Sequence, residues 1–427
     1  MPIDDRMRAQ TQLILDGHPD AAAHPAADRW GEVDNVEYLY REHAVLAREQ
    51  DAERVIGALR DIFDEVGYGD VPEGEPREIR REPVTSGIVR LRVPPTPTLI
   101  PDIVARIDEA LEGPGVATPE HHVYVCGYPC PATEPGEVPL GADPVPSLGL
   151  DGNDGDGVSV SIVDTGLTPN AATGHPWLAG VRGAVENPYT NDSNGDIVIA
   201  PYAGHGTFVA GVLRCIAPKA SVFVERAFDI AGADYETRLA SSLEDALNRD
   251  PDILVFTFTS STHRDQPLLT FDDFYERRIR YMKGLAVLAP AGNEGWSRPM
   301  WPAAHPGVIA VGALAPDGRD RAYFSNYGRW VDVYAAGEDL INAFPEGTYV
   351  CNEPPIGERR QFHGMANWSG TSFSTPLVAG LIAARMSRTG QNAQQAADSL
   401  LRFGSSQAVP GVGAVLYHDQ AYSKDDG

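Results

Sequence analysis

The hydrophobic pattern of residues 36–126 predicts a small, separate domain. In two stretches, residues 52–66 and 100–111, apolar residues recur three and four positions apart, as on one face of a helix. Segments rich in strand-forming residues precede, separate and follow these helices, which gives the order β-α-β-β-α-β. This order is the split βαβ arrangement. We therefore predict an α+β, ferredoxin-like domain over residues 36–126.

Residues 158–405 have a different pattern, in which continuously apolar strands alternate with helices. Strands of this kind are typical of a mostly parallel sheet that helices cover on both faces. We therefore predict an α/β domain whose functional groups lie at the carboxyl ends of its strands. The expected strands are residues 158–166, 221–229, 252–259, 284–295 and 307–314, and the expected helices are residues 206–218, 235–248, 274–283 and 372–386.

Three other segments lack a clear period. Residues 1–35 are polar and rich in alanine, so we expect a loosely ordered arm. Residues 127–157 are dense in Pro, Gly and Asp, which is typical of a linker. Residues 406–427 are interpreted as a C-terminal tail with a final strand.

The helix at residues 372–386 is apolar nearly all round, so it belongs in the middle of a large core. Pro376 falls in its first turn, where a missing N–H is tolerated. Ser372 then lies at the helix N-terminus, where the positive end of the dipole favours developing negative charge. From this segment alone, Ser372 is either a nucleophile or an N-cap residue.

The composition of the chain argues against some classes of binding partner. The 427 residues include 34 basic and 60 acidic side chains, and a net charge of −26 argues against nucleic acid and anionic membranes. No apolar run has the length of a signal peptide's core or of a transmembrane helix, so we expect a cytoplasmic protein.

Metal binding is not the favoured interpretation of any segment. Cys126 and Cys130 form a C-x3-C pair that lacks two further ligands nearby, so free thiols or an occasional disulfide are favoured over a metal site. The acidic sequence DGNDGDG at residues 151–157 does not have EF-hand spacing, and a solvated linker explains it better than a bound cation.

Three residue types found at element ends point to nucleophilic catalysis. Asp164 closes an expected strand, while His205 and Ser372 each lie at the start of an expected helix. A histidine can take the hydroxyl proton as general base, and an aspartate can fix its tautomer. Asn293, at another strand end, and the N–H of Ser372 are the natural donors to an oxyanion.

The motifs around these residues resemble those of the subtilisin-like serine proteases, or subtilases. VDTG, GHGTFVAG, APAGNEG and GTSFSTP occur in the family's order, and the resemblance covers about residues 158–388. It implies a serine endopeptidase that acts on protein or peptide substrates through an acyl-enzyme intermediate. Asp164 would be the orienting acid, His205 the base, Asn293 the oxyanion donor and Ser372 the nucleophile.

One departure from the family concerns the substrate-binding strand. Where the family usually has Ser-Leu-Gly, this chain has Thr257, Phe258 and Thr259. A threonine in place of the glycine is expected to crowd the substrate backbone and reshape the first specificity pocket. We therefore expect a narrow preference or a dedicated protein substrate.

The N-terminal domain resembles the subtilase propeptide in element order, position and size, though not in any motif. This resemblance implies a zymogen whose own N-terminal domain chaperones folding and blocks the site in cis. Many subtilases bind structural calcium, but no ligand position can be transferred, and residues 191–196 are only a weak candidate. No cofactor is expected to be required.

Two alternatives remain open from the sequence. The chain could be a catalytically silent protein that holds a peptide in a subtilase groove, for which the segment Thr257–Thr259 is the only support. The same site could also act mainly on small esters. A fluorophosphonate probe of Ser372 separates the first alternative from a protease, and peptide-extended substrates separate the second.

Overall fold

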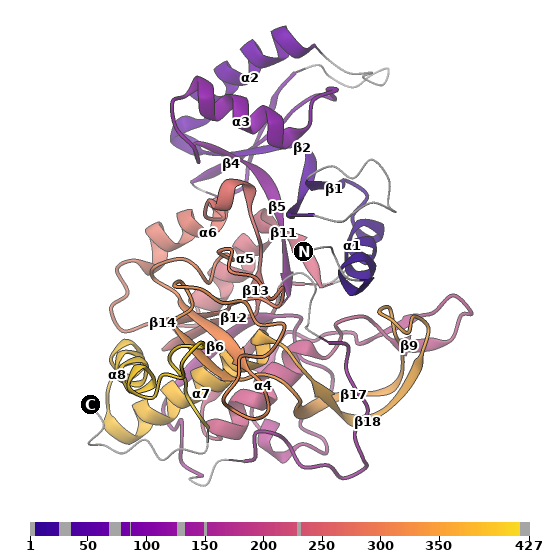
Figure 1. Cartoon of the computed structure of the whole chain (residues 1–427), viewed down its shortest axis with the longest axis vertical. Coiled ribbons are helices and arrows are strands. Elements are labelled where there is room, and N and C mark those ends of the chain that lie inside the picture. Colours follow the sequence, from indigo (N-terminus) through magenta and orange to yellow (C-terminus); the bar gives the residue numbers. More distant parts are fainter. Residues whose placement is uncertain are drawn as a thin grey trace.

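The computed structural model describes residues 5–24, 36–67, 78–85, 87–125, 133–148, 152–228 and 232–418 (Figure 1). Within them, the N-terminal domain has the predicted order of elements, and both of its helices pack on one face of its sheet. It consists of β2 (Tyr38–Arg48), the short 3₁₀ turn η1 (Glu49–Asp51), α2 (Ala52–Val66), β3 (Arg80–Pro83), β4 (Ile88–Arg92), α3 (Ile100–Ala110) and β5 (Ala117–Val125).

The expectation of a loosely ordered arm at residues 1–35 was wrong for its described part. Residues Asp5–Gly17 form helix α1, and Ala21–His24 form strand β1, which pairs antiparallel with β2. Ile14 of α1 is buried against residues of β2 and β5. These elements depend on partners distant in sequence, so a local hydrophobic pattern does not reveal them.

The second domain is built on a seven-stranded parallel sheet, as predicted. Helices α4 and α7 pack on one face, with α8 beside α7, while α5 and α6 cover the other face (Figure 1). The strand order is β16-β15-β14-β12-β6-β10-β7. The strands are β6 (Ser159–Asp164), β7 (Arg182–Gly183), β10 (Ser221–Arg226), β12 (Ile253–Phe256), β14 (Ala286–Pro290), β15 (Ile309–Leu314) and β16 (Val333–Ala336), and the helices are α4 (His205–Ile216), α5 (Glu236–Leu247), α6 (Leu269–Phe274) with the π turn η4 (Tyr275–Ile279), α7 (Thr371–Thr389) and α8 (Ala393–Ser406).

A smaller four-stranded sheet was not predicted. Its order is β18-β17-β9-β8, and its long hairpin leads directly into α7. The strands are β8 (Tyr189–Asn191), β9 (Ile197–Ile199), β17 (Leu340–Val350) and β18 (Arg359–Trp368), and two further short 3₁₀ turns are η2 (Pro176–Leu178) and η3 (His263–Asp265).

The described part of the predicted tail continues the second domain. Val415 and Leu416 are fully buried, and backbone hydrogen bonds join Ala414 and Leu416 to Tyr334 of β16. An isolated bridge thus extends the sheet edge where a final strand was expected. Within the described residues, no helix is both long enough and apolar enough to cross a membrane.

Strands of the two domains pair with one another. β5 of the N-terminal domain lies between β11 (Ala233–Tyr235) and β13 (Phe258–Thr259) of the second domain, and both pairings are antiparallel. The N-terminal sheet therefore continues into the region that the sequence assigns to substrate binding (Figure 1).

Candidate active site

Asp164 and His205 lie together at the predicted element ends. β6 ends at Asp164 and α4 begins at His205, and His205 Nδ1 is 2.9 Å from each carboxylate oxygen of Asp164. Both side chains are fully buried. Since a carboxylate only accepts hydrogen bonds, Nδ1 carries the proton, and the lone pair of neutral His205 is on Nε2. This is the tautomer that a general base of this type requires.

Ser372 is the second residue of α7 and is also fully buried. Its hydroxyl contacts the carbonyl oxygen of Thr257 at 3.4 Å. The ring of Phe373, the next residue, lies 5.2 Å from the ring of His205. The beginnings of α4 and α7 are therefore neighbours, as a nucleophile and its base require.

Asn293 follows β14 and faces the start of α7. Its Oδ1 accepts hydrogen bonds from both the backbone N–H and the hydroxyl of Thr371, each at 2.9 Å. The Thr371 hydroxyl also accepts the N–H of Gly292 at 3.1 Å. Because the carbonyl end of the amide is held in this way, its NH₂ group is the donor end of the side chain. Thr371, which is not among the predicted site residues, fixes that orientation.

The segment Thr257–Thr259 pairs with an extended strand. The Thr257 hydroxyl donates to the Val163 carbonyl oxygen at 2.9 Å, so this side chain is directed into the domain. Phe258 pairs with Val125 and Thr259 with Tyr124 of β5. Thr259 therefore admits a peptide strand beside it, and its effect on the first specificity pocket stays a prediction.

β5 presents alternate side chains to the two domains. Val123 and Val125 join the apolar cluster of the second domain, whereas Tyr124 packs with residues of the N-terminal segments. The Val125 N–H donates to the Gly232 carbonyl oxygen at 2.8 Å, and the Ser260 hydroxyl donates to the His122 carbonyl oxygen at 2.6 Å. The chain thus binds its own strand with backbone bonds and side-chain pockets, as in β-augmentation.

The segment after residue 132 is anchored to β18, which precedes α7 and Ser372. Trp368, whose ring is 5.5 Å from that of His205, donates its Nε1–H to the Thr133 carbonyl oxygen at 2.6 Å. Gly136 and Asn367 exchange two backbone hydrogen bonds. Residues 126–132 connect the two anchored segments and lie outside the described residues, as do Cys126 and Cys130.

The candidate cation ligands within the described residues have other partners. Asp154, of the acidic linker sequence, forms an ion pair with Arg388, while Asp151 lies outside the described residues. In the loop at residues 191–196, Arg359 pairs with both Asp192 and Asp196. Among the described residues, no group of three or more His, Cys, Asp and Glu side chains is placed to hold a metal ion.

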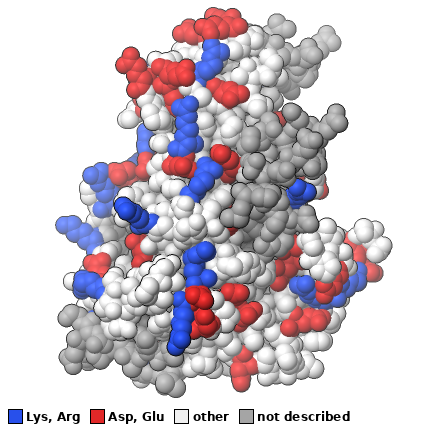
Figure 2. Space-filling model, in the orientation of Figure 1, with Lys and Arg blue, Asp and Glu red and all other residues white. Residues whose placement is uncertain are grey.

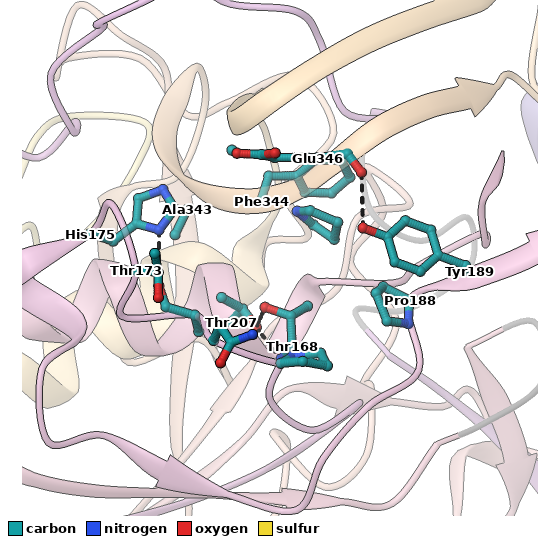
Figure 3. Close-up of a pocket in the computed structure, with 14 residues that line it drawn as sticks. Thr168, Thr173, His175, Pro188, Tyr189, Thr207, Ala343, Phe344 and Glu346 are labelled. Carbon is teal, nitrogen blue, oxygen red and sulfur yellow. Dashed lines mark hydrogen bonds between the residues drawn. The ribbon is translucent and has the colours of Figure 1, made fainter. Parts of the chain in front are cut away.

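A pocket of about 400 Å³ lies beside the first turn of α4 (Figure 3). Its floor includes Thr168 and Thr207, whose hydroxyls are 3.0 Å apart, and the Tyr189 hydroxyl donates to the Glu346 carbonyl oxygen at its rim. His175 lines this pocket and bonds through Nδ1 to a backbone carbonyl. Its imidazole is therefore not the partner of Asp164.

The sequence did not predict a place for Glu186 at the candidate site. Only 7% of it is exposed, and its Oε2 accepts the N–H of Gly204, the residue before His205, at 2.9 Å. Burial raises the pKa of this carboxyl group to about 8, and the charge of Asp164 acts in the same direction. No motif surrounds Glu186, so only the fold reveals its place beside the site.

Comparisons with known proteins bear on the family and the fold of the chain. The model of the subtilase family matches residues 155–402. Thermitase from Thermoactinomyces vulgaris is 29% identical over 263 residues, which are 58% of this chain and 81% of thermitase. Subtilisin E from Bacillus subtilis (strain 168) is 29% identical over 280 residues, 60% of this chain but only 64% of that relative. The crystal structure of fervidolysin from Fervidobacterium pennivorans, described as a keratinolytic enzyme related to subtilisin, shares the fold with a TM-score of 0.53 at 18% identity, over 89% of this chain and 60% of that one.

Proposed function

Because the chain belongs to the subtilase family of serine proteases, we propose that it is an endopeptidase whose triad is Asp164, His205 and Ser372. The observation that carries this proposal is the buried pair of Asp164 and His205 at the start of α4, next to the start of α7. A silent binding protein would not need this pair, so the arrangement supports catalysis.

The geometry supports an acyl-enzyme mechanism. Nε2 of His205 takes the hydroxyl proton as Ser372 Oγ attacks the peptide carbonyl carbon, while Asp164 stabilises the imidazolium. The NH₂ group of Asn293 and the N–H of Ser372 stabilise the oxyanion. The imidazolium then protonates the leaving amine, and water, activated by the same base, releases the acyl group.

The N-terminal domain is proposed to inhibit this site in cis. Its strand β5 fills the groove between β11 and β13, and Asp164, His205 and Ser372 are fully buried in this arrangement. Arg48 forms an ion pair with Asp272, and the N-terminal domain and the second domain are also joined by the ion pairs Asp108–Arg264 and Glu37–Arg298.

A cleavage within residues 126–132 would release this domain. The described ends of this segment both lie next to residues near the site: Val125 pairs with Phe258, and Thr133 is hydrogen bonded to Trp368. Val123 and Val125 fill apolar pockets, which favours substrates with aliphatic side chains two residues apart.

Protein or peptide partners follow from this function, whereas nucleic acid is not expected as a partner. On the face shown in Figure 2, Lys and Arg side chains are scattered among acidic ones rather than gathered in one basic surface. The net charge of −26 also argues against nucleic acid, because an acidic protein repels phosphate backbones.

Labelling with a fluorophosphonate probe tests the proposal. We expect the wild-type chain to be labelled at Ser372 after release of the N-terminal domain, and Ser372→Ala to remain unlabelled. A processed wild-type chain that is not labelled would contradict the assignment of Ser372 as the nucleophile.

A further inference from the structure

Glu186 is connected to the backbone beside His205. Its carboxyl group accepts the Gly204 N–H at 2.9 Å, and the Thr165 side chain lies near enough to favour the charged form of the carboxyl group. Oγ1 of Thr165 accepts the Gly206 N–H at 3.1 Å. The buried carboxyl group therefore holds the peptide unit before His205 directly and lies next to the residue that holds the one after it.

The two glycines need such support because of their own geometry. Gly204 has φ +82°, and a Cβ there would lie 2.4 Å from Cδ of Pro345. A Cβ on Gly206 would lie 2.3 Å from the Gly166 carbonyl oxygen. No larger residue fits at either position, and glycine loses the most backbone freedom on folding. Hydrogen bonds to their N–H groups offset this cost and keep the start of α4 in one conformation.

We propose that Glu186 is a positioning residue of the protease, which fixes the backbone of His205 and thereby the hydrogen bond between Nδ1 and Asp164. This inference rests on the proposed function. Glu186 acts through the backbone, so its removal should lower the rate of acyl transfer more than the affinity for substrate. A displacement of about 1 Å in a catalytic group can reduce a rate by about 100-fold.

The charge of Glu186 adds a second, measurable property. Asp164 at the end of β6 and His205 on α4 face it, and Arg226 of β10 donates to the carbonyl oxygen of the preceding residue, Val185. Burial raises the pKa of Glu186 to about 8, so it is neutral below that pH and anionic above it. The anion stabilises the imidazolium form of His205, and activity should therefore change as Glu186 ionises.

The test compares Glu186→Ala and Glu186→Gln with the wild type, using kcat and KM of the processed protein from pH 5 to 10. Glu186→Ala leaves the Gly204 N–H without its acceptor, so we expect kcat to fall by about 10- to 100-fold and KM to change by less than about 3-fold. Glu186→Gln keeps an acceptor but cannot ionise. It should retain kcat within about 3-fold at pH 7 and lack the inflection that we expect for the wild type near pH 8.

Glu225→Gln is the matched control, because Glu225 is equally buried but pairs with Arg249 instead. Its pH profile should keep the wild-type inflection. The inference is overturned if Glu186→Ala keeps the wild-type kcat, if Glu186→Gln keeps the inflection, or if the control reproduces both changes. A processed wild-type chain without fluorophosphonate labelling would contradict the proposed function itself, whereas normal labelling with unchanged Glu186 variants would contradict this inference alone.

Discussion

Different interactions hold two regions of the molecule, the start of α4 and the contact between the two domains. Around His205, the neighbours are fully buried rings and glycines that admit no larger residue: Trp368, Phe373, Gly204 and Gly206. The contact between the domains has apolar clusters too, but it also contains one inserted strand, several ion pairs and a group of histidines: His18, His24, His121, His122 and His263.

This difference corresponds to two requirements of the proposed zymogen. Close packing holds one geometry because a core has few alternative arrangements, which suits a site that must not change. Exposed ion pairs contribute little stabilising free energy. Histidines change their charge with pH, and both properties suit a contact that must open. The predictions below test each half of this contrast, in order of decreasing effect.

The largest effect is expected from Asp164→Asn. The amide cannot hold His205 in the tautomer with a proton on Nδ1, so kcat should fall by about 10⁴-fold with the fold intact. Steady-state kinetics on a peptide substrate would measure this change. Asp156→Asn, at an exposed aspartate outside the site, is the control and should keep wild-type activity. A loss below 10-fold for Asp164→Asn would remove Asp164 from the mechanism.

A smaller effect is expected from Glu120→Ala at the domain contact. Glu120 is fully buried and accepts hydrogen bonds from Arg41 at 3.2 Å and Arg90 at 2.7 Å. Its removal leaves the buried Arg41 and the half-buried Arg90 with only the more exposed carboxylates of Asp20 and Glu82, and should destabilise this region by about 3 kcal/mol. Denaturant unfolding of the Ser372→Ala chain would measure the loss.

Glu82→Ala provides the control for that experiment. Glu82 also pairs with Arg90, but its side chain is 43% exposed, so the expected cost is below about 1 kcal/mol. Equal losses in the two variants would contradict the view that the buried carboxylate stabilises the contact.

Acid should weaken the contact between the domains. Burial lowers the pKa of His24, His122 and His263, the last to about 4, whereas an exposed histidine titrates near 6.5. The docked form therefore binds fewer protons than the undocked form, and docking loses stability as pH falls from about 6.5 towards 4. Protection factors of the β5 amides against hydrogen exchange, measured in the Ser372→Ala chain, should fall over this range.

The variant His122→Phe tests how much of the response to acid comes from this one histidine. Neither ring nitrogen of His122 has a hydrogen-bond partner among the described residues, and the ring packs 4.0 Å from that of Tyr235, so phenylalanine should fit and reduce the response to acid. Protection in α8 should stay constant in both chains. If α8 and β5 lost protection together, acid would be unfolding the whole protein rather than opening the contact.

The smallest effect is expected from removal of metal ions. Asp154, Asp192 and Asp196 pair with arginines, so the described residues give no reason for a required cation. Activity and melting temperature should be unchanged after treatment with EDTA. A fall in melting temperature that calcium restores would show a structural calcium site and correct this interpretation.

The sequence predicted the parts of the molecule that local patterns determine. The apolar period of α2 and the motifs around Asp164, His205, Asn293 and Ser372 identified the fold and the candidate site. The sequence did not predict α1, the β17–β18 hairpin, or the insertion of β5 between β11 and β13. These features depend on pairing between distant segments, which no local period records. The sequence did not predict the role of Glu186 for the same reason, since its hydrogen-bond partner Gly204 is 18 positions away in the chain.

The intact mass of the wild-type chain and of Ser372→Ala, incubated side by side, tests the central claim most directly. We predict that the wild type separates into two fragments by a cut within residues 126–132, while the mutant stays whole. If both chains stay whole at pH 7 and at pH 5, or if the mutant is cut at the same place, the account of a self-processing zymogen is contradicted.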